Sequence, residues 1–244
     1  LNGDYELDAA IMDGRTRNAG AVGALQGVRS PIAAARMVMD RTPNVLIVGE
    51  SARHLADAAG LASVKDPGAY YAPVDERTRQ VGAPEIGTVG AVALDSYGDM
   101  AAATSTAGVM NKTPGRLGDT PVIGAGTWAD ERCAISCTGL GEYFIRANAA
   151  ADVSARIRYG GDTLVPAVQG ALDDVKRLGR WRDGGLLQFR RHEACHGRFQ
   201  WPVRGRDFPV MIVFWILLGL AVFAFALAAQ MRMIISVALR RALA

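Results

Sequence analysis

The chain has 244 residues, of which half are hydrophobic and only 7% are aromatic, and it contains 28 glycines. This length and composition predict one large or two small domains with a closely packed α/β or layered core. The net charge is only +3, and most of the excess arginine lies between Arg177 and Arg206. Because no basic stripe is interleaved with aromatic residues, we expect no nucleic-acid partner.

The three cysteines do not form a disulfide framework. Cys133 and Cys137 lie in a predicted strand, where four residues separate the Cα atoms by roughly 13 Å, too far for a disulfide. Cys195 is then left over. This usage is typical of a reducing compartment and predicts a cytoplasmic location for residues 1–186.

Caps, breakers and periodicity predict four segments in the first 87 residues. A helix begins at Pro31 after the N-cap Ser30 and ends near Arg41, because Pro43 disfavours helix before it. An apolar run at 45–48 is either a buried strand or a segment that leads into the next helix, which is expected at 50–59. A long exposed linker follows at 65–87.

The next hundred residues predict strands followed by helices. Thr88 and Met100 begin two paired strands, which end at 94 and 106 and are joined by a turn at Gly98. A third strand is expected at 133–138, and amphipathic helices at 141–159 and 163–178.

The character of the sequence changes after about residue 186. Residues 187–207 are an arginine-rich, aperiodic linker, residues 208–231 carry no charge, and residues 232–244 are a basic tail. A run of more than 20 apolar residues predicts a transmembrane helix and membrane association; the alternative is a buried core helix. A second explanation is an artefactual tail, produced by a shifted reading frame or a fusion.

The segment "HEACH", residues 192–196, matches the H-E-x-x-H pattern of zinc metalloproteases. Gly197 and Pro202 leave little room for the helix that this pattern requires, and no third ligand is apparent. A zinc protease is therefore the weaker alternative function.

The pair Gly87–Thr88 allows two interpretations. Thr88 is β-branched and suits the start of a strand, which is the structural interpretation. In the functional interpretation, cleavage between the two residues frees an α-amino group with a pKa of about 7.7–8.0. That amine can act as general base for the hydroxyl of its own residue, so that no histidine is needed.

The segments "GTVGAVALDSYGDMAAATSTAG", "NKTPGRLGDTPVIGAGTWAD" and "CAISCTGLGE" resemble the plant-type L-asparaginase/isoaspartyl peptidase family of N-terminal-nucleophile hydrolases. Upstream, "YELDAAIMDG" and the residues that follow are similar to the α-subunit of that family. The resemblance covers residues 5–185. It implies a four-layer αββα sandwich and autocleavage between an α-subunit-like region, residues 1–87, and a catalytic β-subunit-like region, residues 88–186.

The resemblance also implies the roles of individual residues. Thr88 matches the nucleophile, Thr106 the threonine that assists it, and Thr138 with Gly139 the oxyanion-hole pair. Arg116 and Asp119 match the residues that hold the α-carboxylate and α-amino group of an aspartyl or asparaginyl unit. No cofactor and no catalytic metal are implied. The expected substrates are isoaspartyl dipeptides and L-asparagine, and the expected assembly is a homodimer of αβ units.

Three departures from the family pattern affect these expectations. Ala107 stands where the family has glycine, the family's first core strand is missing, and its closing strands are absent after "GGLL" at residues 184–187. We therefore expect an incomplete sandwich. A truncated or frame-shifted, membrane-tethered and inactive relative is the alternative to an active hydrolase.

Overall fold

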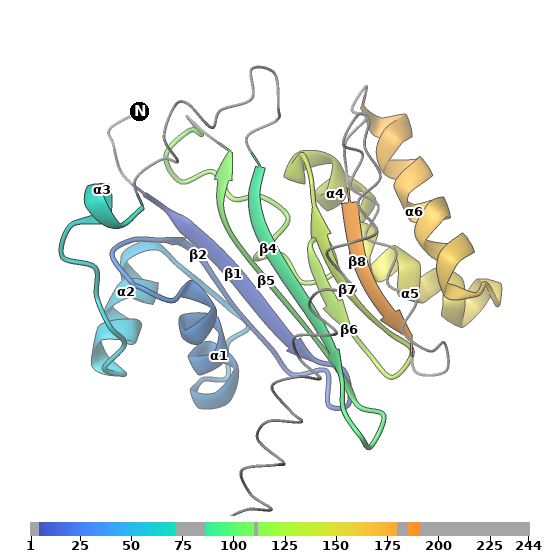
Figure 1. The fold of residues 1–244 in the computed structure, drawn as a ribbon, viewed down its shortest axis with the longest axis horizontal. Helices are drawn as coiled ribbons and strands as arrows, with labels where there is room; N and C mark the ends of the chain where they lie inside the picture. The colour runs from blue at the N-terminus through green and yellow to red at the C-terminus, as the bar shows by residue number, and fades with distance from the viewer. Residues whose placement is uncertain (1–4, 72–85, 110–111, 180–184, 191–244) are drawn as a thin grey trace, which may run out of the picture. The chain divides into compact units, whose positions relative to one another are not determined.

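The computed structural model describes residues 5–71, 86–109, 112–179 and 185–190 (Figure 1). Within these ranges the chain has an α+β fold with two β-sheets. The five-stranded sheet has the order β3-β2-β1-β5-β4 and the three-stranded sheet the order β6-β7-β8. Neighbouring strands are antiparallel except for β2 and β3, which are parallel.

The strands are short and the helices are of ordinary length, apart from one single turn. The strands are β1 (Leu7–Asp13), β2 (Ala19–Leu25), β3 (Leu46–Val48), β4 (Ile86–Leu94), β5 (Met100–Val109), β6 (Thr127–Ala129), β7 (Cys133–Thr138) and β8 (Gly185–Arg190). The helices are α1 (Pro31–Arg41), α2 (Gly49–Ala58), α3 (Pro67–Tyr70), α4 (Gly141–Ala147), α5 (Ala149–Gly160) and α6 (Leu164–Leu178).

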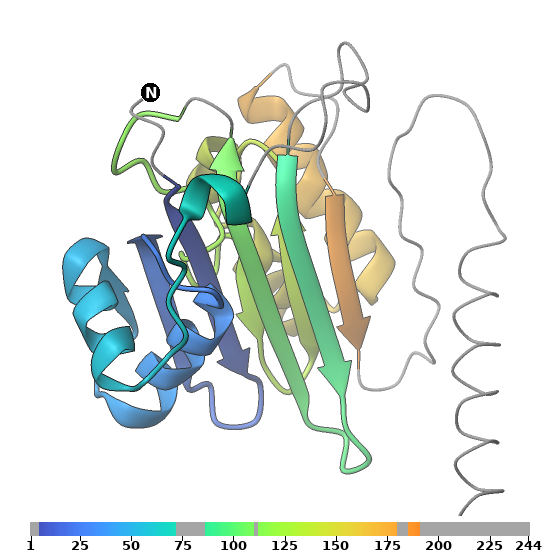
Figure 2. The same ribbon diagram turned by 60° about the vertical axis from the view of Figure 1, so that its left-hand side comes forward.

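Three apolar clusters hold helices and sheets together in layers (Figures 1 and 2). Ala9 and Val22 face α1 and α2 on one side of the larger sheet. Met12 and Met100 face the smaller sheet on the other side. The outer face of the smaller sheet packs on α4, α5 and α6. Because side chains alternate along a strand, each strand of the larger sheet supplies residues to both of its faces.

The predicted first helix and hairpin are confirmed. Ser30 caps α1, since its Oγ accepts a hydrogen bond from the Ala33 N–H, and Pro31 occupies the first turn. The β4–β5 hairpin turns at Gly98, whose φ of 85° is accessible to glycine. The hairpin begins two residues earlier than expected, at Ile86, so that Gly87 already belongs to β4.

Of the two interpretations of residues 45–48, the buried strand is wrong in its burial, whereas the segment does lead directly into α2. β3 pairs only with β2 at the edge of the sheet, and Val45 and Val48 are about half exposed. An apolar run reveals a strand but not whether the strand lies at an edge.

The prediction of one helix over 141–159 is also wrong, because Asn148 interrupts it. Asn148 has φ 48° and ψ 47°, the left-handed conformation, and it separates α4 from α5. Its Oδ1 lies so close to Gly124 that a Cβ there would approach it to 2.6 Å. Asparagine adopts this conformation more readily than most residues. The loop at Gly124 lies against Asn148, where the helix is interrupted.

The structure also contains elements that the sequence did not predict. The linker contains the single-turn α3, and the short strand β6 lies in a region with no predicted element. The strands β1 and β2 were not predicted either, although they form the centre of the larger sheet.

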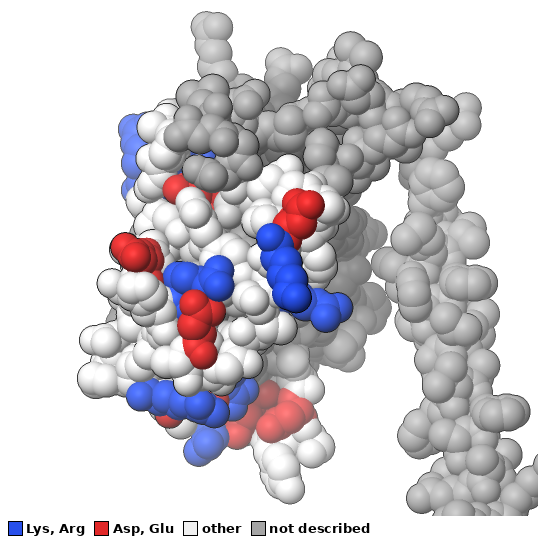
Figure 3. Space-filling view, turned by 90° about the vertical axis from the view of Figure 1, so that its left-hand side faces the viewer, with Lys and Arg blue, Asp and Glu red and all other residues white. Residues whose placement is uncertain are grey.

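The face formed by α1 and α2 carries charges of both signs side by side (Figure 3). Arg36 pairs with Asp40 on α1, and Arg53 pairs with Asp57 on α2, each one helical turn apart. Such exposed pairs contribute little to stability. This face offers no single-sign patch.

The predicted membrane span, residues 208–231, lies outside the described residues, as do the linker 187–207, apart from its first four residues in β8, and the tail 232–244. Among the residues that the structure describes, no helix is both long and apolar enough to cross a bilayer.

Candidate active site

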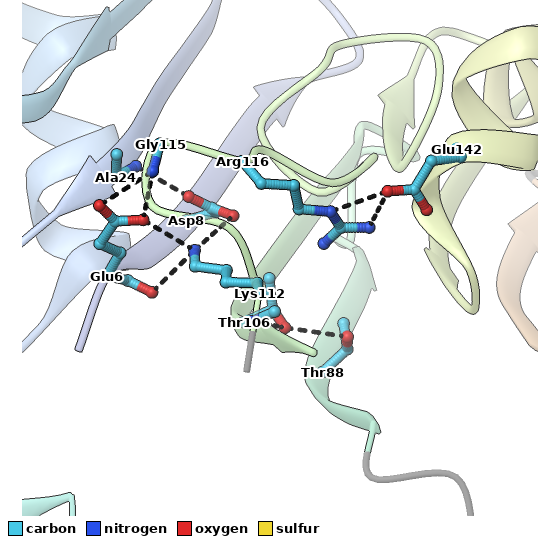
Figure 4. A network of polar contacts seen from close by, with 10 residues as sticks. Glu6, Asp8, Ala24, Thr88, Thr106, Lys112, Gly115, Arg116 and Glu142 are labelled. Carbon is cyan, nitrogen blue, oxygen red and sulfur yellow. Dashed lines mark hydrogen bonds and ion pairs between the residues drawn. The ribbon is translucent and has the colours of Figure 1, made fainter. Parts of the chain in front are cut away.

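Two threonine hydroxyls meet at the beginning of β4. Thr88 on β4 is directly opposite Thr106 on β5, and the Thr88 Oγ1 donates a hydrogen bond of 3.2 Å to the Thr106 Oγ1 (Figure 4). Thr106 is buried, and its Oγ1 also accepts a 2.9 Å hydrogen bond from the Gly108 N–H. The pair is therefore fixed by strand register as well as by the hydroxyl contact.

The peptide bond before Thr88 lies at an irregularity of the strand. The register between β4 and β5 shifts between Ile86 and Thr88, because Ala107 and Gly108 on β5 lie opposite the single residue Gly87 on β4. Gly87 is exposed, and apart from its chain neighbours no atom of the described residues lies within 4 Å of the position where its Cβ would be. The space on the side-chain side of Gly87 is thus open among the described residues, while Thr88 is half-buried.

A buried carboxylate continues the line of the two threonines into a third strand. Asp8 on β1 pairs in register with Thr106 on β5, which in turn pairs with Thr88. Asp8 is fully buried, and its Oδ1 accepts a hydrogen bond from the Ala24 N–H. Burial raises the pKa of Asp8, although this hydrogen bond and the charge of Lys112 oppose the shift.

Thr138 lies on the smaller sheet, at the end of the interface between the two sheets that also holds Thr88 and Thr106. Thr104 Oγ1 and Ser136 Oγ are 2.7 Å apart across the two sheets. A Cβ at Gly90 would lie 2.2 Å from that Ser136 Oγ, so glycine allows β4 to approach β7 closely. Thr138 follows Ser136 by two residues and shares its face of β7, as Thr106 follows Thr104 on β5.

The hydroxyl of Thr138 is buried without a partner. Its Oγ1 has no hydrogen-bond partner among the residues that the structure describes. Gly139, the next residue, has a φ of 155°, at the edge of the region that favours glycine. A buried hydroxyl without a partner loses about 1–3 kcal/mol, which a ligand oxygen at this position would restore.

Arg116 and Asp119 lie on the loop between β5 and β6, but they do not form the surface ion pair that a glycine-rich turn would favour. The Arg116 Nε and Nη2 lie 2.8 and 2.7 Å from the same oxygen, Oε1 of Glu142 (Figure 4). Partial burial alone would raise the pKa of Glu142, but the hydrogen bond from Arg116 holds it below its usual value.

Asp119 is a buried carboxylate with an unused acceptor. It is 5% exposed, and its Oδ2 has no hydrogen-bond partner among the described residues. Burial raises the pKa of Asp119 to about 7, against the attraction of the Arg116 charge. Burial also raises the pKa of the neighbouring Cys137 thiol, and the Asp119 charge adds to this. An ammonium ion is the partner that such a carboxylate would bind.

Two acidic residues, Glu6 directly before β1 and Asp8 on β1, contact the loop that carries Arg116. The Glu6 carboxylate accepts hydrogen bonds of 3.2 and 3.1 Å from the Gly115 N–H. Lys112 Nζ donates to the Glu6 carbonyl oxygen at 3.2 Å and lies 3.5 Å from Glu6 Oε2 and 3.9 Å from Asp8 Oδ2. These contacts fasten the loop to β1 beside the threonine pair (Figure 4).

The structure brings most of the predicted site residues to one end of the sheet interface. Thr88 and Thr106 are in contact, Thr138 points to the same end, and Arg116 and Asp119 lie on one loop. The methyl group of Ala107 is exposed and its φ is not positive. Alanine is therefore accommodated without backbone strain where the family has glycine.

Sequence reasoning missed Glu6, Asp8, Lys112 and Glu142. The available signal was the pair of acids two residues apart in an otherwise apolar run, "YELDAAIM", which places both on one face of a strand. The partners themselves could not be read from the sequence, because they lie on distant elements.

The described residues contain no group of three His, Cys, Asp or Glu side chains that could hold a metal ion. The zinc pattern at residues 192–196 lies outside these residues, so it stays a prediction.

The described residues form an α+β fold in which two threonine hydroxyls are in contact at one end of the sheets. The family model described as "Asparaginase" matches residues 1–77 and 68–201. The chain belongs to the asparaginase family, and the resemblance inferred from its motifs is confirmed.

Individual relatives agree with this assignment. An isoaspartyl peptidase of Salmonella typhimurium is 45% identical over 204 residues, which cover 76% of this chain and 64% of that protein. A mouse isoaspartyl peptidase/L-asparaginase is 40% identical over 191 residues, covering 72% and 57%. A plant-type L-asparaginase of Pyrococcus horikoshii is 41% identical over 183 residues, covering 66% and 59%. The chain thus spans less than two thirds of the length of these relatives.

Proposed function

We propose that this chain is an autoprocessing threonine amidohydrolase that cleaves isoaspartyl peptides and L-asparagine after its own Gly87–Thr88 bond has been cut. The observation that carries the proposal is the Thr88–Thr106 hydroxyl contact directly after the exposed Gly87. The names of the relatives supply the reaction class.

Self-cleavage requires only Thr88, its neighbour and water. The Thr88 Oγ attacks the Gly87 carbonyl carbon, the C–N bond breaks, and the hydroxyl proton passes to the Thr88 nitrogen. Water then hydrolyses the resulting ester, which leaves a carboxylate on Gly87 and restores the Thr88 hydroxyl. The open space around Gly87 supports this step, because the carbonyl must leave its ladder geometry to meet the hydroxyl.

Substrate hydrolysis then uses the new α-amine as general base. The amine accepts the Thr88 hydroxyl proton, the Oγ attacks the side-chain amide carbonyl, and the proton passes on to the leaving amine or ammonia. Water hydrolyses the acyl-threonine ester and releases L-aspartate. The unpartnered Thr138 Oγ1 and the backbone N–H of Gly139 are the candidates to stabilise the oxyanion; removing one such donor typically costs about 2.7–4 kcal/mol.

Arg116 and Asp119 are the candidate substrate-binding groups. A guanidinium binds a carboxylate through two parallel hydrogen bonds, and the buried Asp119 carboxylate is suited to an ammonium group. Together they would select substrates that carry a free α-carboxylate and a free α-amino group. We propose these roles for Arg116 and Asp119 together with the reaction itself.

The layered fold supports the same assignment. We take it as the four-layer αββα sandwich of N-terminal-nucleophile hydrolases, incomplete at its sheet edges. β4 is the edge of its sheet among the described strands, and Val89 on it is 72% exposed. The proposal includes a homodimer of cleaved units in the cytoplasm.

Incubation of the purified full-length chain tests the proposal. We expect two fragments on a denaturing gel, the second beginning Thr-Val-Gly-Ala, followed by release of L-aspartate from an isoaspartyl dipeptide. A chain that stays whole on prolonged incubation would support the inactive-relative alternative instead. Activity that depends on bound zinc would support the metalloprotease alternative.

A further inference from the structure

The edge of the Arg116 guanidinium that can bind a carboxylate is already occupied. Nε and Nη2 form one edge of the group, and both contact Oε1 of Glu142. This is the edge that forms two parallel hydrogen bonds with a carboxylate. A ligand carboxylate that binds here must take the place of Glu142.

Glycine backbone lies close to the guanidinium. The Cβ position of Gly118 is 3.1 Å from Nη1, 3.6 Å from Cζ and 3.7 Å from Nη2 of Arg116, and that of Gly108 is 3.6 Å from Nη1. Arg116 itself is only 17% exposed, whereas Glu142 is 55% exposed. Because this exposed side chain contacts the Nε–Nη2 edge, that edge is the side on which a ligand can approach.

The backbone of Glu142 is held in place by packing, whereas its side chain can move away from Arg116 into solvent. It follows Gly141, where a Cβ would lie 2.7 Å from the Asp119 nitrogen, so that the start of α4 packs against the Arg116–Asp119 loop. The Glu142 side chain is 55% exposed and reaches solvent when it releases Arg116. When the pair breaks, water solvates the exposed Glu142 carboxylate, and the ligand carboxylate takes its place on Arg116.

The Glu142 charge also acts on Asp119. It is one of the charges that favour the protonated form of Asp119, which is unsuited to an ammonium ligand. The Glu142 charge thus acts on both candidate substrate groups.

We propose that Glu142 is a specificity-determining residue that occupies Arg116 in the free protein and must be displaced by the α-carboxylate of the substrate. This rests on the proposed function. A ligand without that carboxylate cannot displace Glu142, so the pair excludes such ligands. Glu142 competes with the substrate carboxylate only in the free protein. The competition therefore lowers the affinity for the bound substrate and for its transition state by the same factor.

The test compares Glu142→Gln with the parent and with Glu131→Gln in the processed full chain. Glu131 is a matched control, because it is 51% exposed and also pairs with an arginine, Arg132. For Glu142→Gln we expect a KM for an isoaspartyl dipeptide that is about two- to fivefold lower, with kcat within about twofold. Glu131→Gln leaves both constants unchanged.

Binding of L-aspartate, measured by calorimetry, separates this inference from the proposed function. The Kd falls by the same two- to fivefold in Glu142→Gln, whether or not the protein turns over a dipeptide. For Glu142→Asp, whose shorter side chain weakens the contact with Arg116, we expect a Kd between those of the parent and Glu142→Gln. This variant replaces Glu142→Gln if the glutamine variant is unstable.

An unchanged or higher KM and Kd in Glu142→Gln, with active parent enzyme, overturns the inference and leaves the proposed function intact. A higher KM would identify Glu142 as a residue that orients Arg116. A parent that binds L-aspartate but hydrolyses nothing refutes the proposed function alone, and the Kd comparison still decides the role of Glu142. A parent that neither hydrolyses a dipeptide nor binds L-aspartate refutes both.

Discussion

The Oγ1 atoms of Thr88 and Thr106 lie 3.2 Å apart because their residues are paired in register across β4 and β5. The register continues to Asp8 on β1, so that three polar residues lie side by side across three strands. Strand pairing therefore sets the geometry of the candidate nucleophile, and loops add Arg116 and Asp119 around it.

Thr88→Ala is expected to abolish the fragment that begins at residue 88, because alanine has no hydroxyl to attack the Gly87 carbonyl. Thr88→Ser retains a hydroxyl, so cleavage is expected to continue at a lower rate. Thr113→Ala, the same change at an exposed threonine of the neighbouring loop, is the control and cleaves like the parent. Mass spectrometry of aged samples measures all three. A normal fragment from Thr88→Ala would exclude Thr88 as the nucleophile.

Thr106→Val is expected to keep the fold and lower both self-cleavage and turnover by about 10- to 100-fold. Valine has the shape of threonine and suits a strand, but it removes the acceptor for the Thr88 hydroxyl and the Gly108 N–H. The loss corresponds to one or two hydrogen bonds at a buried position. Gel densitometry and ammonia release from L-asparagine measure the two rates. Thr106→Ser should recover most of each rate, and a fully active valine variant would contradict the assisting role.

Asp119→Asn is expected to stabilise the protein above pH 7 while lowering turnover. The unfolded chain ionises this carboxyl near its ordinary pKa of 3.8, but burial raises the pKa in the folded state to about 7. Between these values the folded state binds more protons, so the free energy of unfolding falls as pH rises. The asparagine variant does not lose stability in this way. Its free energy of unfolding is expected to exceed that of the parent by on the order of a few kcal/mol above pH 7 and to equal it near pH 4.

Urea denaturation at pH 4, 6 and 8 measures the gain, with Asp40→Asn on the surface of α1 as the control that shows none. Turnover of Asp119→Asn is expected to fall by roughly 30- to 1000-fold, because the substrate ammonium loses its counter-charge. In the parent, kcat/KM should rise through about pH 7 as Asp119 ionises. A pH-independent difference in stability would contradict the raised pKa.

Lys112→Met is expected to destabilise the protein by about 3 kcal/mol, because it leaves the buried Asp8 and Glu6 carboxylates without their counter-charge. The double variant Asp8→Asn/Lys112→Met should recover part of the loss, since the neutral amide needs no cation. Lys176→Met is the control, because Lys176 is exposed and its pair with Asp173 contributes little. Equal effects of the two single lysine variants in thermal denaturation would argue against the role of Lys112.

Local chemistry explains which elements could be predicted. α1 was predicted with its cap because Ser30 and Pro31 are adjacent signals, and the hairpin was predicted because Gly98 marks its turn. The central strands β1 and β2 were missed, although Asp13 at the end of β1 and Gly14 after it are residues typical of a hairpin turn. The helix break at Asn148 was missed because it depends on the loop at Gly124, which is distant in sequence.

The candidate site divides in the same way. Thr88, Thr106, Thr138, Arg116 and Asp119 could be proposed as site residues because they stand in short ordered motifs. Glu142 was missed as the partner of Arg116, although it lies only a few residues after Thr138. A motif identifies a residue type and spacing, but it does not show which side chain an arginine will meet.

The sequence by itself determined the family, the candidate nucleophile and the charged pair, because these depend on residues that are close together in the chain. Only the tertiary structure decided that Asp8 lies in line with the threonines, that Glu6 and Lys112 fasten the loop that carries Arg116, and that Glu142 occupies Arg116. These contacts arise from strand register and from the packing of α4 on the loop. Register and packing are set by the whole buried surface rather than by any local segment.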